Sequence, residues 1–194
     1  GLWSGVQAIN SEARASYDAA AATLGEGQFD QLVPRVGDRI PQSVYVDLRR
    51  AGWLVSPILD VTFKGVRFVG IDPLTTPTQM SFSSDSGFSL EDTDLIFANA
   101  EVASLLEGFV EVTIDKSIPP GIAIADIGVV QRLFKRNDLS RLMVLPEQPI
   151  RRPDLVKIAP ELVVQPSQQI ADVAALTDSF HLNLTAFGFL SFAV

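Results

Sequence analysis

A chain of 194 residues with 47% hydrophobic and 20% charged side chains has the composition of a globular protein, large enough for one domain or two small lobes. Its net charge of −8 argues against a nucleic-acid-binding protein, which needs a basic face to displace the counterions of phosphate groups. Because the chain has no cysteine, disulfides, zinc–thiolate sites, iron–sulfur clusters and cysteine nucleophiles are excluded.

The first predicted element is a long helix over residues 2–24. Apolar residues recur there at steps of three and four, and the segment is rich in alanine, which favours helix. The sequence GEG, at Gly25 to Gly27, ends it.

A strand, a helix and a hairpin follow. Residues 29–35 predict a short strand, and residues 40–52 a helix with Pro41 in its first turn and Gly52 beyond its last. The segments WLVSPILDVTF and VRFVGID, joined by Lys64-Gly65, predict a β-hairpin, because β-branched and aromatic residues flank a tight turn.

Residues 74–94 predict a long loop with turn residues and acids but little apolar periodicity. Its acidic cluster consists of Asp85, Glu91, Asp92 and Asp94. Several carboxylates from one loop can bind a hard cation such as Ca²⁺, but the spacing does not match an EF-hand. A solvated acidic loop is the preferred interpretation, and whether residues 85–94 bind a cation is left open.

Short strands alternate with helices in the next part of the chain. The predicted strands are residues 95–99, 109–114, 122–126, 139–145 and 161–165, and the predicted helices are residues 100–108 and 127–136. Basic doublets close two of the predicted helices, at Arg49-Arg50 and Lys135-Arg136, where their charge complements the helix dipole.

A second long helix is expected over residues 168–194, with Pro166-Ser167 as its start signal. Both terminal helices become more apolar toward the outer ends of the sequence, so we expect them to continue into membrane spans. No lysine or arginine occurs from Ile158 to Val194, whereas cytoplasmic loops beside membrane spans are enriched in both. This predicts a domain on the outer side of the membrane.

No chemical signature indicates catalysis. His181 is the sole histidine, no G-x-S-x-G motif is present, and neither P-loop nor dinucleotide fingerprints occur. Asn183 begins a formal glycosylation sequon inside the last predicted helix. We therefore name no catalytic, cofactor-binding or metal-ligating residue, expect no cofactor, and expect a protein that is not an enzyme.

Several segments, taken in order, resemble the FtsX-like permease family of ABC transporters, in particular the MacB-type periplasmic core domain. They are GVQAINSEARASYDAA, SPILD with GVRFVGIDPL, GIAIADIGVVQRLF, and the closing LNLTAFGFLSFAV. The resemblance implies an α+β fold with two mixed α/β lobes, extracytoplasmic and bracketed by the two terminal stalk helices. Lobe 1 would comprise residues 28–73 plus 138–165, and the inserted lobe 2 residues 74–137.

The resemblance also implies function, location and partners. The domain would couple ATP-driven membrane movements to export, or to the handling of a substrate or partner, at the periplasmic face of the inner membrane. Its partners would be a separate cytoplasmic ATP-binding subunit that does not contact it, a second permease copy or homologue forming a dimer, a periplasmic accessory protein, and the membrane itself. Residues 74–94 depart from the better-known exporters, which leaves the substrate open.

Two other classes of protein remain as alternatives. The long flanking helices suit equally well the outer ligand-binding sensor domain of a receptor with two membrane spans. A membrane-tethered hydrolase is the third class, and a pocket that holds paired carboxylates of raised pKa would favour it.

Overall fold

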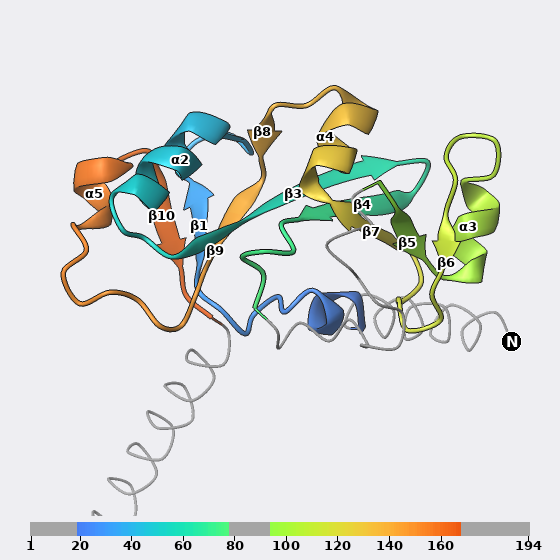
Figure 1. The fold of residues 1–194 in the computed structure, drawn as a ribbon, viewed down its shortest axis with the longest axis horizontal. Coiled ribbons are helices and arrows are strands. Elements are labelled where there is room, and N and C mark those ends of the chain that lie inside the picture. Colours follow the sequence, from blue (N-terminus) through green and yellow to red (C-terminus); the bar gives the residue numbers. More distant parts are fainter. Residues whose placement is uncertain (1–18, 78–93, 168–194) are drawn as a thin grey trace, which may run out of the picture.

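The computed structural model describes residues 19–77 and 94–167. Within them, one mixed sheet of eight strands runs in the order β10-β1-β9-β3-β4-β7-β5-β6 (Figure 1). The strands are β1 (Gln31–Pro34), β3 (Val55–Phe63), β4 (Val66–Ile71), β5 (Ile96–Ala98), β6 (Thr113–Ile114), β7 (Ile122–Asp126), β9 (Arg141–Val144) and β10 (Leu162–Gln165). The β4–β7 and β5–β6 pairs are parallel and the other neighbouring pairs antiparallel. The expected mixed α/β fold is confirmed at this level.

The predicted hairpin is confirmed as β3 and β4. Phe63 pairs with Val66, so the loop consists of Lys64 and Gly65 alone. Both loop residues have positive φ angles, 51° and 76°, as a two-residue type I′ turn requires. This turn sets the register that places Asp60 opposite Val69 further along the hairpin.

Four helices cover one face of the sheet: α2 (Gln42–Arg50), α3 (Ala100–Leu105), α4 (Ile127–Phe134) and the single turn α5 (Leu155–Ile158). Asn99 caps α3 by accepting a bond from the Val102 amide, and Asp126 caps α4 by accepting one from the Gly128 amide. Beneath α3 and α4 lies one apolar cluster around Phe68, and beneath α2 and α5 a second around Leu142.

The opposite face is covered by residues 19–29. Residues 19–23 are helical, and Ala20, Leu24 and Phe29 pack on core residues of the central strands, including Ile58, Val69, Ile124 and Met143. Figure 1 shows this segment and α2 on opposite sides of the sheet. The sheet is thus the middle layer of three, which explains why its central strands carry apolar residues at successive positions.

Two strand predictions differ from the structure. The segment 109–114 is a strand only at Thr113–Ile114, because its partner β5 has just three residues and pairs only through Phe97 and Ala98. The segment 139–145 is divided at Ser140. Residues before it form β8 (Asp138–Leu139), which pairs with β2 (Ile40–Pro41), and residues after it form β9 in the large sheet.

The strands of the expected lobes share the one large sheet. Strand β4 lies in residues 28–73 of the expected lobe 1, and β7 lies in residues 74–137 of the expected lobe 2. The two strands pair through five consecutive positions. Of the expected helix over residues 2–24, residues 19–24 are described, and residues 19–23 of these are helical. Residues 1–18, and the whole of the helix expected over residues 168–194, lie outside the described part. Among residues 19–77 and 94–167, none of the helices has the length and apolar character of a membrane span.

Candidate functional site

Three charged side chains interrupt the apolar face that residues 19–29 cover. Asp60 lies two positions from Ile58 in β3, Arg67 two positions from Val69 in β4, and Arg141 two positions from Met143 in β9. Since side chains alternate between faces along a strand, all three charges lie on the face of those core residues.

Asp60 is the centre of this group. The Arg67 guanidinium donates to both of its carboxylate oxygens, with Nε–Oδ1 2.9 Å and Nη2–Oδ2 3.0 Å. Arg141 also donates to Oδ2 through Nη1. The Asp60 backbone amide donates to Ser140 Oγ at 2.9 Å, which holds β3 against the end of β8. One carboxylate thus connects β3 with the two neighbouring strands, β4 and β9.

Glu26 completes the group from outside the sheet. It lies in the turn directly after the helical residues 19–23, and its Oε1 accepts bonds from Arg67 Nη2 and from Arg141 Nη2, the latter at 3.2 Å. The four residues Glu26, Asp60, Arg67 and Arg141 are here called the clamp.

The clamp balances two negative with two positive charges. Its side chains are 12–24% exposed, which means that each is largely withdrawn from water. Partly buried ion pairs of this kind are costly to break on one side, because the remaining charge stays desolvated. The two carboxylates accept from the two guanidinium groups, and this network holds Glu26 against the adjacent strands β9, β3 and β4.

The two ends of the described part are here called the N-terminal flank (residues 19–30) and the C-terminal flank (residues 166–167). The C-terminal flank is also fixed to the sheet. Strand β10 pairs with β1, with Gln31 opposite Gln165 and Pro34 opposite Leu162. Just beyond the paired residues, the Ser167 amide donates to Asp30 Oδ1 at 2.8 Å. The Asp30 carbonyl accepts from the Val144 amide at 2.8 Å. The N-terminal and C-terminal flanks therefore come together beside the neighbouring strands β1 and β10.

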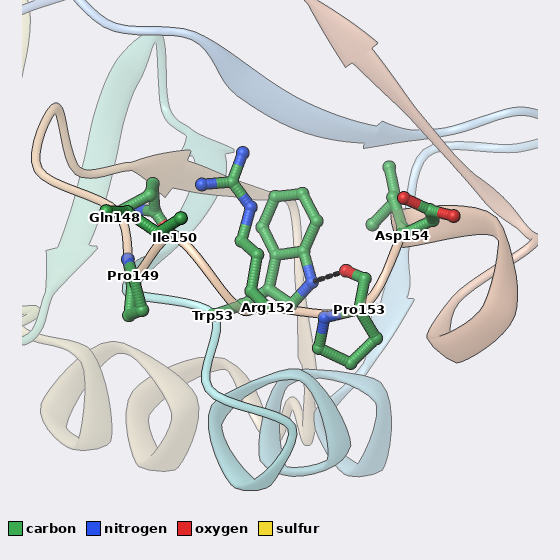
Figure 2. A pocket seen from close by; sticks show the side chains of 8 residues that line it. Trp53, Gln148, Pro149, Ile150, Arg152, Pro153 and Asp154 are labelled. Atoms are coloured by element: carbon green, nitrogen blue, oxygen red, sulfur yellow. Dashed lines mark hydrogen bonds between the residues drawn. The ribbon is translucent and has the colours of Figure 1, made fainter.

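A cavity of about 420 Å³ lies on the helix-covered side, beside Trp53 (Figure 2). The Arg152 side chain runs along the indole, with its guanidinium carbon 4.3 Å from the ring centroid, and the indole Nε1 donates to the Pro153 carbonyl at 3.0 Å. Gln148 both donates to and accepts from the backbone of Leu54. These contacts fix the segment 148–153 to Trp53 and Leu54, the two residues before β3, so we interpret the arrangement as structural.

Most of the residues singled out in the sequence lie outside the described part of the chain. Of the acidic cluster, only Asp94 is described, and its Oδ1 accepts from Arg132 Nη2 at 2.5 Å at the protein surface. His181 and Asn183 lie outside the described residues. Within the described part, no group of three or more His, Asp and Glu residues could hold a metal ion.

The basic doublets have different roles. Arg49 and Arg50 occupy the last turn of α2, as predicted. Lys135 is the residue that caps α4 in the left-handed conformation, with φ 52°, and Arg136 lies beyond it. Arg136 pairs with Asp138 through Nη2–Oδ1 at 2.6 Å. The clamp itself was not predicted from the sequence.

Comparison with known proteins adds no identification: no protein-family model matches the chain, and no curated protein matches it.

Proposed function

We propose that this chain is the extracytoplasmic domain of an ABC-transporter permease of the FtsX-like type, which relays ATP-driven movement of membrane segments and performs no chemistry itself. In this proposal it lies at the periplasmic face of the inner membrane. Its partners are a cytoplasmic ATP-binding subunit and a second permease copy or homologue. The order of the resembling sequence segments is the first support.

The observation that carries the proposal is the adjacency of the two flanks. A domain inserted between two neighbouring membrane helices must receive and return its chain at one place. Here β1 and β10 are antiparallel neighbours, and the bond between Asp30 and Ser167 fixes the point where the flanks meet.

The clamp supports a mechanical role for the N-terminal flank. A helix transmits displacement along its axis only if its end is fixed to the body that must move. Leu24 packs into the core at 1% exposure, and Glu26, two residues later, is held by two arginines from different strands. Movement of the helical residues 19–23 would therefore be passed to β4 and β9 directly.

The location is tested by labelling the full-length protein in intact cells with a membrane-impermeant maleimide. The absence of native cysteine in this chain makes a single introduced cysteine a clean reporter within it. Ile150→Cys places the thiol at a fully exposed position, and Leu142→Cys, at a fully buried one, is the control. Labelling of Ile150→Cys only after lysis would refute an extracytoplasmic location.

The relay is tested in the full-length transporter reconstituted with its ATP-binding subunit. Glu26→Gln should lower transport per ATP hydrolysed while hydrolysis itself continues, because the flank can then move without moving the sheet. Glu107→Gln, at an exposed position after α3, is the matched control. Equal coupling in the two variants would count against the relay, and failure to associate with any ATP-binding subunit would favour the sensor alternative.

A further inference from the structure

An open cavity of about 320 Å³ adjoins the clamp. Glu26 and Phe29 line it from the N-terminal flank, Gln31 and Val33 from β1, and Gln165 from β10. Its volume is at the lower end of the range for small-molecule sites, so it suits a ligand with few non-hydrogen atoms.

Gln31 is the residue that distinguishes this cavity. It is only 9% exposed, and in the described part of the chain its side-chain amide forms no hydrogen bond with the protein. The side chain is largely buried along its length, and its amide lies at the wall of the open cavity, where its donor and its acceptor are both unused by the described residues. The Gln31 amide is therefore available to hydrogen-bond with a group that enters the cavity.

Two other polar groups lie beside it. Gln165 is the direct cross-strand partner of Gln31, so their side chains lie next to each other on one face of the sheet. Glu26 uses Oε1 for both arginines, and its Oε2 accepts no hydrogen bond from the described residues. The cavity thus offers two carboxamides, which donate and accept, and one oxygen that only accepts.

The charged groups of the cavity do not favour an anion. Both terminal nitrogens of Arg141 already bind carboxylates, Nη1 that of Asp60 and Nη2 that of Glu26. Ser140 is engaged with the backbone of Asp60. Since the clamp is neutral as a whole, an added charge would find no uncompensated opposite charge, and a neutral ligand with a donor and an acceptor fits best.

We propose that this cavity binds a secondary amide group. Its carbonyl oxygen accepts from the Gln31 amide, its N–H donates to Glu26 Oε2 or to a glutamine carbonyl, and the carbon groups on either side contact Phe29 and Val33. Peptide bonds and N-acetyl groups of sugars share this chemistry. The proposal is independent of the proposed function, although a ligand on Glu26 would also contact the clamp.

The test is an NMR titration of the side-chain amide signals of the chain with two probes. N-acetyl-alanine-methylamide represents the peptide source and N-acetylglucosamine the sugar source. We expect saturable shifts of the Gln31 and Gln165 side-chain signals with one probe or both, and the probe that saturates at the lower concentration identifies the source. Absence of saturable shifts with either probe overturns the proposal.

Variants locate the site. Gln31→Met keeps the side-chain volume and should weaken binding about tenfold, the effect of losing one or two well-placed hydrogen bonds. Gln42→Met, at the exposed start of α2 on the other face, should bind as the unmodified chain does.

Because the Gln31 amide is unpaired in the free protein, Gln31→Met should not lower the Tm. Unchanged binding by Gln31→Met would overturn the proposed location, and a lowered Tm would show that the amide has a structural partner instead.

Discussion

Glu26 and Arg141 are separated by 115 positions in the sequence and joined by a carboxylate–guanidinium hydrogen bond of 3.2 Å. The bond connects the turn that ends the N-terminal flank with β9 in the middle of the sheet. Arg67 of β4 shares the same carboxylate oxygen. The flank is therefore held by charge as well as by the apolar contacts of Leu24 and Phe29.

Removal of the Glu26 charge should destabilise the fold. In Glu26→Gln, two guanidinium groups share the single carboxylate of Asp60, and we expect a loss of about 1–2 kcal/mol in the free energy of unfolding. Urea denaturation measures it, with Glu107→Gln as the exposed control. The same urea midpoint in both variants would show that the clamp adds no stability.

Asp60 should matter more than Glu26, because both arginines and three strands depend on it. We expect Asp60→Asn to lose about 3 kcal/mol, because its removal leaves two partly buried guanidinium groups with one carboxylate fewer. In contrast, Asp94→Asn breaks only the exposed pair with Arg132, and should cost at most about 0.5 kcal/mol. The three urea midpoints give the order directly, and a larger loss in Asp94→Asn than in Asp60→Asn would contradict it.

Much of the sheet could be predicted from the sequence, because its signals are local. The loop Lys64-Gly65 indicates the hairpin, and continuous apolar runs such as the IAIA of residues 122–125 indicate strands that are buried on both faces. The order of the strands was not predicted, since the parallel β4–β7 pair joins residues about 55 positions apart in sequence.

The clamp illustrates why the candidate site could not be predicted. Asp60, Arg67 and Arg141 each interrupt an apolar strand, which is a visible local anomaly. Their pairing depends on register and strand order, and neither can be read from periodicity. Glu26 carries no signal of its own inside GEG, where the glycines predict only the end of a helix. The place of Gln31 in the wall of a cavity likewise depends on the pairing of β1 with β10 and cannot be read from the sequence.

Gly70 should not tolerate a side chain. A Cβ atom there would lie 2.9 Å from the Ile127 Cα and 3.2 Å from Val130 side-chain carbons, because the start of α4 packs directly on β4. We expect Gly70→Ala to lower the free energy of unfolding by about 1–3 kcal/mol through overpacking. Thermal unfolding measures this, with Thr113→Ala on the exposed edge strand β6 as control. An unchanged Tm in Gly70→Ala would mean that α4 can move away at no cost.

Tyr45 should make stability fall at alkaline pH. Burial raises the pKa of its phenol above the ordinary value of 10.0, Asp72 raises it further, and Arg49 and a hydrogen bond with Thr75 oppose the change. The unfolded chain therefore releases this proton at a lower pH than the folded chain does. The contribution is fully present below about pH 10, the ordinary pKa, and is lost as pH rises toward the pKa of the folded state.

Tyr45→Phe removes this proton and keeps the ring. The difference in urea midpoint between the unmodified chain and Tyr45→Phe should be constant near neutral pH and should change in favour of the variant above about pH 10. Lysines titrate in the same range in both proteins, so their effect cancels in the difference. Absorbance near the phenolate band should show that Tyr45 ionises at higher pH in the folded than in the urea-unfolded chain. A difference that is independent of pH would mean that the phenol is as well solvated in the folded state as in the unfolded one.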